Sequence, residues 1–204
     1  MDTSLTAALG IGFLLGLRHA TDADHVAAVS TFVAQHRSLA KSCLLGTFWG
    51  AGHTVALLTA GVATIAFKLT ISPAVERGLE TLVGFALIAL GGQVLLGGAH
   101  SGGGHIYMLR AGRRSFLVGL LHGLAGSAAL MLLVLSTIAH PLGGLLYITM
   151  FGVGSTAGML LLSGLIALPF VLTAGRWTAV NTVIRRVAGA GSLGLGLYLV
   201  VERI

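Results

Sequence analysis

The sequence contains few charged residues, and this scarcity argues against an ordinary soluble domain. Only 9% of its 204 residues are Asp, Glu, Lys or Arg, whereas 55% are hydrophobic and the mean hydropathy is +0.96. A soluble domain of this size does not need so apolar a composition to form its core. We therefore interpret the chain as an integral membrane protein.

Other absences narrow the class further. With a single cysteine, Cys43, the chain cannot form an intrachain disulfide or a dithiol electron relay. It has neither the G-x-x-x-x-G-K-[ST] string of ATP-binding loops nor the H-E-x-x-H string of metalloproteases, so an enzyme is not expected. The first apolar run also lacks the basic flank of a cleavable signal sequence. Because the ATP-binding string is absent, any movement of a solute by this protein is expected to be driven by an electrochemical gradient or by a partner protein.

Six apolar segments are each long enough for the roughly 20 residues of a membrane-spanning helix. They cover residues 5–34, 44–67, 79–98, 115–138, 142–173 and 183–201. The fifth is unusually long and is interrupted by Gly152, Gly154 and Gly158. The predicted fold class is an all-α integral membrane protein with six transmembrane helices.

Basic residues are concentrated on one side of the predicted bundle. Eight of them follow the first, third and fifth segments: Arg37, Lys41, Arg110, Arg113, Arg114, Arg176, Arg185 and Arg186. On the opposite side, basic residues are balanced by acidic ones. The positive-inside rule therefore predicts a multi-pass protein of the cell inner (cytoplasmic) membrane with both termini extracytoplasmic. No nucleic-acid partner is expected, because the basic residues are scattered over short loops without interleaved aromatic residues.

The two halves of the chain resemble each other. Residues 13–19 (FLLGLRH) are echoed by residues 116–122 (FLVGLLH), and residues 49–54 (WGAGHT) by residues 151–156 (FGVGST), at offsets of 103 and 102. The two matches occur in the same order at nearly the same offset, which indicates a duplication.

This duplication predicts the domain organisation. Each half contains three helices, an odd number, so the second copy enters the membrane upside down. We therefore expect a single transmembrane domain over residues 1–204, built from two inverted three-helix repeats. The repeats cover about 5–98 and 115–201, and a cytoplasmic loop over about 99–114 joins them.

A cluster of ionisable residues interrupts the first apolar segment. Residues 18–25 read Arg-His-Ala-Thr-Asp-Ala-Asp-His. A charge at the bilayer centre costs about 2.5–3.5 kcal/mol on insertion scales, so such groups must pair, face water or hold an ion. Two imidazoles and two carboxylates at this spacing suit a divalent transition metal.

The spacing leaves two backbone conformations open. On a continuous helix, His19, Asp22 and His25 lie along one side and Asp24 points away, toward Arg18 or another helix. If the helix is unwound within this segment, as in discontinuous transporter helices, both Asp24 and His25 turn inward. We favour the broken helix.

These residues resemble the signature of a known family. Residues 18–25 look like the R-H-A-x-D-A-D-H string of the nickel/cobalt transporter (NiCoT) family. Residues 45–55, with Gly50, Gly52, His53 and Thr54, are similar to the following helix of that family and its G-H-[ST] element. Longer members carry eight helices, whereas residues 121–127 resemble small bacterial relatives, some described as urease-associated. The resemblance thus implies a small six-helix member.

The resemblance implies transition-metal permeation through His19, Asp24 and His25, with His53 contributed by the next helix. Together with the cluster itself, this defines the expected metal ligands, which are His19, Asp22, Asp24, His25 and His53. The expected pathway or supporting residues are Arg18, Trp49, Thr54, His122, Ser127 and Ser155. Of these, His122 and Ser155 occupy the repeat positions of His19 and His53.

The expected function is secondary-type transport of divalent nickel or cobalt ions through a site near the bilayer midplane, in the direction of uptake. Three alternatives use the same cluster: an efflux permease, a membrane metal-delivery or sensor protein, and a metalloenzyme. The ion is the substrate and no cofactor is expected. The expected partners are the ion and the lipid bilayer, while a homo-oligomer and a role for His100 and His105 in the loop stay open.

Overall fold

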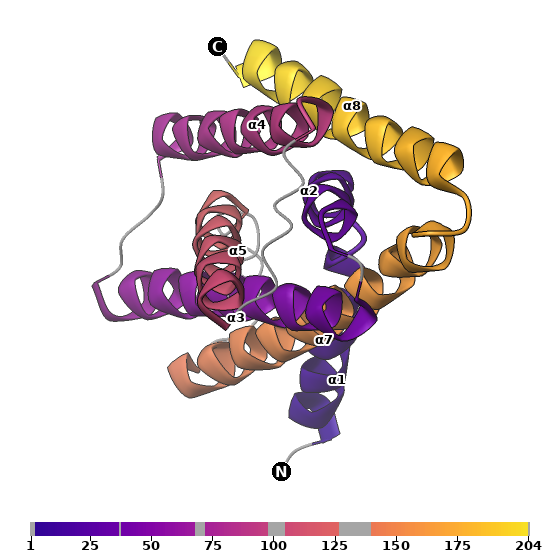
Figure 1. Cartoon of the computed structure of the whole chain (residues 1–204). Helices are drawn as coiled ribbons and strands as arrows, with labels where there is room; N and C mark the ends of the chain where they lie inside the picture. Colours follow the sequence, from indigo (N-terminus) through magenta and orange to yellow (C-terminus); the bar gives the residue numbers. More distant parts are fainter. Residues whose placement is uncertain (1–2, 37, 68–71, 98–104, 127–139, 204) are drawn as a thin grey trace.

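The computed structural model describes residues 3–36, 38–67, 72–97, 105–126 and 140–203. Over these ranges the chain is all-helical, which confirms the predicted class for this part of the chain (Figure 1). The helices are α1 (Thr3–His19), α2 (Ala23–Ala34), α3 (Leu39–Phe67), α4 (Pro73–Leu95), α5 (His105–Ala125), α7 (Pro141–Thr173) and α8 (Thr178–Arg203).

Four helices, α3, α4, α7 and α8, are long and apolar enough to cross a membrane. The 12-residue α2 is too short to do so alone, since about 20 residues are needed. Together, α1 and α2 occupy the first predicted apolar segment, which is divided by a non-helical stretch at residues 20–22. The predicted interruption of this helix is therefore present.

Two helices differ from the expectation, one in where it begins and one in its continuity. Helix α5 begins at His105, so the later part of the predicted loop 99–114 is helical. Helix α7 runs without a break through Gly152, Gly154 and Gly158. Glycines can pack against other helices without breaking the helix that carries them. In an apolar surrounding, the backbone N–H and C=O groups have no other hydrogen-bond partners, so the helix stays continuous. Residues 127–139, which hold much of the fourth predicted segment, lie outside the described ranges.

The helices approach one another closely at small residues. Helix α1 packs on α7, where a methyl group at Gly16 would overlap the Phe151 carbonyl. Helix α5 packs on α3 in the same way, with Gly119 against the Trp49 carbonyl. Helices α4 and α8 form a third pair, in which the Ser192 hydroxyl donates to the Leu87 carbonyl at 3.0 Å. Such contacts are typical of helix packing in membranes.

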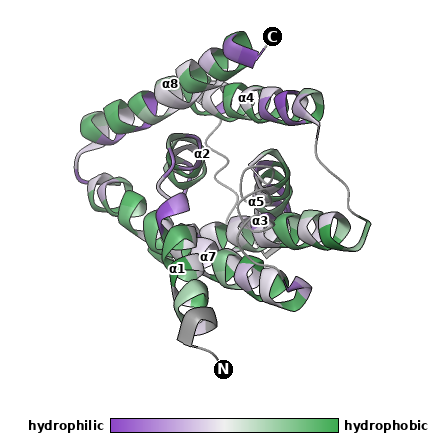
Figure 2. Cartoon of the chain, turned by 180° about the vertical axis from the view of Figure 1, so that it is seen from behind, coloured by the Kyte–Doolittle hydropathy of each residue, from purple (hydrophilic) through white to green (hydrophobic). Residues whose placement is uncertain are grey.

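Apolar side chains also cover the outside of the molecule. Leu14, Leu165 and Val201 are 62%, 66% and 78% exposed. Figure 2 shows hydrophobic residues along most of the long helices and a hydrophilic stretch where α1 meets α2. Apolar residues that face outward over whole helices suit a lipid environment, and the polar stretch between α1 and α2 marks the candidate site.

Candidate metal centre

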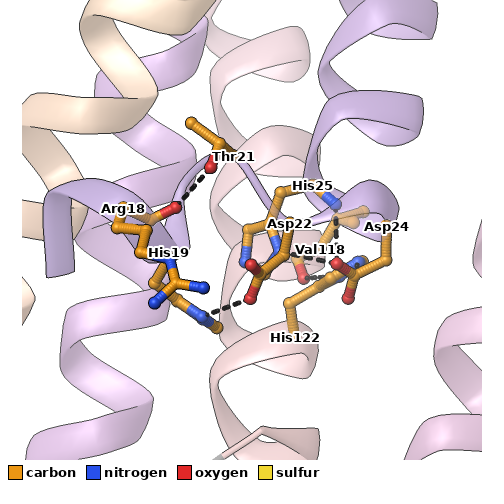
Figure 3. Close-up of polar contacts among 8 residues, drawn as sticks. All are labelled: Arg18, His19, Thr21, Asp22, Asp24, His25, Val118 and His122. Carbon is orange, nitrogen blue, oxygen red and sulfur yellow. Dashed lines mark hydrogen bonds and ion pairs between the residues drawn. The ribbon is translucent and has the colours of Figure 1, made fainter. Parts of the chain in front are cut away.

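The break between α1 and α2 positions the candidate ligands. Helix α1 ends at His19, and the Thr21 hydroxyl donates to the Arg18 carbonyl at 2.6 Å to close a turn (Figure 3). Helix α2 then begins at Ala23, with Asp24 in its first turn. A carboxylate is favoured there, because the amide groups at a helix N-terminus carry partial positive charge. Two helix ends therefore meet at the centre of the polar cluster.

Three imidazoles from three helices converge at this break. His19 of α1, His25 of α2 and His53 of α3 each offer a ligand atom, and these atoms all lie within 4.8 Å of one another. The ring centroids are 4.6 Å apart for His19 and His25, and 5.1 Å for His19 and His53. His25 and His53 are almost completely buried. The structure thus brings together three of the five residues expected as ligands.

Several ring nitrogens in this cluster are buried without a hydrogen-bond partner. They are Nε2 of His25 and both nitrogens of His53. A buried polar atom that lacks a partner costs about 1–3 kcal/mol. A metal ion bound between the rings would satisfy these nitrogens, so the residues present fit a metal.

The two carboxylates contact the imidazoles. Asp24 Oδ1 accepts a hydrogen bond from the His25 backbone N–H at 2.9 Å and lies 2.9 Å from His25 Nδ1. Asp22 Oδ2 lies 2.7 Å from His19 Nδ1. A carboxylate on Nδ1 leaves Nε2 free to bind metal and fixes the orientation of the ring. This geometry is typical of carboxylates that support a histidine ligand.

A fourth imidazole comes from the second half of the chain. His122 of α5 has its ring centroid 5.2 Å from that of His25, and its Nε2 lies 3.9 Å from Asp24 Oδ2. Its Nδ1–H donates to the Val118 carbonyl at 3.1 Å. The Nε2 atom is buried without a hydrogen-bond partner and lies beside Asp24 (Figure 3). His122 therefore belongs to the same cluster as the first-half histidines.

The remaining expected residues lie in different surroundings. Trp49 is buried with its ring 4.9 Å from that of His122. Thr54 instead lies where α3 meets α7, with its hydroxyl oxygen 2.8 Å from the Gly50 carbonyl oxygen and 2.9 Å from that of Gly152. Ser155 is buried and its hydroxyl has no hydrogen-bond partner. Ser127 lies outside the described residues.

Arg18 does not form the ion pair with Asp22 or Asp24 that the continuous-helix arrangement would have allowed. Its side chain is exposed, and in the described part of the chain both carboxylates pair with His19 and His25 instead. The turn that ends α1 separates Arg18 from α2 and so turns the acids toward the imidazoles. His36, just after α2, is buried; its Nδ1 lies 2.8 Å from the Phe32 carbonyl oxygen, and burial lowers its pKa.

A cavity of about 320 Å³ adjoins the cluster, between α2, α4, α5 and α8. Its lining includes Asp24, His25 and His122, and also Glu80 of α4. The sequence pattern did not single out Glu80, since it lies far along the chain from the other acids and only helix packing brings it to the same cavity. Imidazole with carboxylate is a donor set that suits nickel, cobalt, zinc or copper(II), whereas magnesium and calcium prefer oxygen ligands.

Comparison with known proteins places the chain in a family. No family model and no solved structure matches it. It is 40% identical over 210 residues to the urease accessory protein UreH of Bacillus sp. (strain TB-90), covering 97% of this chain and 92% of that protein. It is 24% identical over 174 residues to the chloroplast protein FOR GROWTH AND FERTILITY 2 of Arabidopsis thaliana, 78% of this chain but 46% of that protein. Because the first similarity extends over nearly the whole of both proteins, the chain belongs to the family of the urease accessory protein UreH.

Proposed function

We propose that this protein carries divalent nickel or cobalt ions across the membrane through a site made by His19, His25 and His53. The observation that supports it best is the meeting of these three imidazoles at the break between α1 and α2, with ligand atoms within 4.8 Å of one another. Discontinuous helices in transporters bind ions in this way, because the unwound backbone and the helix ends face the ion. The four long apolar helices support a location in a membrane.

Within this site we assign different tasks to the acids and the imidazoles. His19, His25 and His53 bind the ion, while Asp22 and Asp24 hold the first two rings and balance the charge of the ion. The contacts of 2.7 Å and 2.9 Å between the carboxylates and the Nδ1 atoms support this assignment. Arg18 and Trp49 lie outside the ligand set. Trp49 shapes the site by covering His122.

The helical arrangement that we propose is two inverted three-helix repeats. Reciprocal contacts support it, since each repeat presents glycines to carbonyls of the other. The glycine and carbonyl pairs are Gly16 with Phe151, Gly154 with Phe13, Gly119 with Trp49, and Gly52 with Phe116. If each residue is replaced by its equivalent in the other half, the first pair becomes the third and the second becomes the fourth. The hydroxyls of Thr54 and Thr156, equivalent residues in the two halves, lie 3.0 Å apart, as expected near a two-fold axis.

The two halves then make unequal contributions to the path. The first half supplies the acids and three imidazoles. The second half supplies His122 and Ser155, and the Nε2 atom of His122 and the hydroxyl of Ser155 are buried without a hydrogen-bond partner. We assign these two residues to weaker, neutral donors along the path beside the site, because a permeating ion must leave its strong ligands as well as bind them. The proposed direction is uptake.

A second candidate function is metal delivery without transport. It is favoured by one observation, that the similar Bacillus protein is named an accessory protein. Flux by the purified protein alone separates the two. Reconstituted in proteoliposomes, a transporter takes up nickel or cobalt unaided, whereas a delivery protein binds the ion without flux.

The experiment that tests the proposal is uptake of nickel by proteoliposomes, with cobalt, zinc and manganese as competitors. We expect nickel and cobalt to compete with each other most strongly and His19→Ala to abolish uptake. His140→Ala is the matched control, because His140 is an exposed histidine at the start of α7. Uptake at the wild-type rate by a folded His19→Ala protein would contradict the proposal.

Membrane orientation needs a separate test. We propose that both termini are extracytoplasmic, on the basis of the uneven distribution of basic residues between the loops. The Ser4→Cys variant should react with an impermeant thiol reagent in intact cells, and the Ser101→Cys variant should react only after the membrane is permeabilised. The reverse pattern would show that the orientation is wrong.

A further inference from the structure

The cavity beside the histidine cluster joins buried donors to a more exposed acid. Asp24, His25 and His122 line it, and the His122 side chain is only 1% exposed with Nε2 lacking a hydrogen-bond partner. Glu80 lines the same cavity and its side chain is 27% exposed. His19 also lines it, and the rest of the wall is mainly apolar, with the largest share from α8. Polar atoms are thus few in this cavity, and most belong to groups that attract or bind a cation.

Glu80 forms an ion pair with Arg203. Its Oε2 lies 2.9 Å from Nε of Arg203, the last residue of α8, whose side chain is 36% exposed. The Nε atom is buried and the contact is not a well-formed hydrogen bond, so only the attraction between the charges of two partly exposed side chains holds the pair, and such pairs are weak. A divalent cation can therefore replace Arg203 at the carboxylate. Because Glu80 and Arg203 are more exposed than His25 and His122, they mark the outer end of the cavity.

A second cavity has the opposite charge. It measures about 220 Å³ and lies at the other end of α2 and α4, where its lining includes Arg110, Arg114 and Gln93 but no carboxylate. Arg114 donates to the side-chain oxygen of Gln93 at 3.0 Å. Two guanidinium groups without an acid repel a divalent cation. Of these two cavities, only the one with Glu80 has the charge to collect the ion.

We propose that the cavity between α2, α4, α5 and α8 is the route by which a divalent cation reaches the histidine cluster, and that Glu80 captures the ion at its outer end. Arg203 neutralises Glu80 until the ion arrives. This inference rests on the proposed transport function and adds to it a capture site outside the histidine cluster. Helix α4 begins and α8 ends on the side that the charge distribution predicts to be extracytoplasmic, so the route suits uptake.

The first test compares two glutamates on α4. Glu80→Gln should slow nickel uptake at subsaturating concentration by about 3- to 10-fold, at or just below the lower end of the roughly 10- to 1,000-fold by which charged clefts alter the rate of association. Equilibrium affinity, measured by calorimetric titration of nickel, should stay within about twofold, because the histidine ligands are untouched. Glu76→Gln is the control, since Glu76 lies one turn earlier and does not line the cavity.

Salt provides an internal check on this comparison. The screening length falls from about 10 Å at 0.1 M salt to about 3 Å at 1 M, so the difference between wild type and Glu80→Gln should shrink at high salt. If wild type takes up nickel and Glu80→Gln behaves like Glu76→Gln at low salt, the capture site is wrong while the transport function stands.

The second test needs no transport. In a Cys43→Ser background, Leu199→Cys places a thiol on the cavity wall, whereas Leu197→Cys places one on an exposed part of α8 outside the cavity. Charged methanethiosulfonate reagents should modify Leu199→Cys faster, because such reagents react with thiols in water rather than in lipid. Adding Glu80→Gln should lower the rate ratio of the cationic to the anionic reagent several-fold, since Arg203 is then unpaired.

The two tests separate the possible failures. If the wild type does not take up nickel but the reagent ratio at Leu199→Cys depends on Glu80, the proposed function is wrong and the charged access route stands. If Leu199→Cys is as unreactive as Leu197→Cys, the cavity is closed to water and filled by lipid or side chains, and the access route is overturned. The access route is also overturned if the ratio of cationic to anionic reagent rates at Leu199→Cys is the same with Glu80 and with Glu80→Gln.

Discussion

Replacement of Asp24 by Asn separates the charge of this carboxylate from its geometry. Asp24 Oδ1 lies 2.9 Å from both the backbone nitrogen and the Nδ1 atom of His25. An asparagine has the same size and keeps an oxygen that can accept from the backbone N–H and from Nδ1–H. Only the negative charge is lost. Asp24→Asn therefore asks how much the charge contributes to holding a metal ion on His25 Nε2.

The structure sets the expected magnitude. Loss of a group that supports a metal ligand typically costs about 10–100-fold in metal affinity. The Asp24 side chain is 33% exposed, so water screens part of its charge. We expect the lower part of that range, a loss of about 10-fold, which corresponds to about 1.4 kcal/mol. Asp22 is 53% exposed, and Asp22→Asn should cost less than Asp24→Asn.

Calorimetric titration of the purified variants with nickel and cobalt measures these differences. Asp24→Ala should weaken binding more than Asp24→Asn, because it also removes the hydrogen-bond acceptor for His25. The reasoning fails if Asp24→Asn binds as tightly as wild type or if Asp22→Asn is the weaker binder. If Asp24→Asn loses binding as completely as His25→Ala, then Asp24 is a direct ligand and its contact with Nδ1 is incidental.

Three further outcomes are expected. Metal affinity should fall as the pH is lowered, because a protonated imidazole cannot bind metal, and calorimetric titration between pH 5.5 and 7.5 tests it. His122→Ala should slow proteoliposome uptake more than it weakens binding, whereas His53→Ala should reduce both; equal loss of binding in the two variants would indicate a symmetric site. In thermal unfolding, Gly119→Ala should destabilise by about 1–3 kcal/mol because its methyl group overlaps the Trp49 carbonyl, whereas Gly10→Ala, with open space around it, should not.

The sequence by itself determined the helical class and indicated which residues form the candidate site. The scarcity of charge and the long apolar segments depend only on composition and order, and the cost of burying charge in an apolar medium makes them decisive. The spacing within residues 18–25 left a continuous and a broken helix open, of which the broken helix was favoured, and α1 ends at His19 while α2 begins at Ala23. His19 and His25 are close in sequence, so their proximity across the turn between α1 and α2 follows from local geometry.

Only the tertiary structure decided how distant residues meet. His53 and His122 reach His25 because glycines let α3 and α5 approach each other closely, and the sequence states neither which faces touch nor how far one helix is displaced along another. The same packing sets Glu80 on the wall of the cavity that holds Asp24. The partners of the carboxylates, the start of α5 inside the predicted loop and the continuity of α7 likewise depend on tertiary packing. Side-chain contacts between helices are set by packing, which local sequence patterns do not encode.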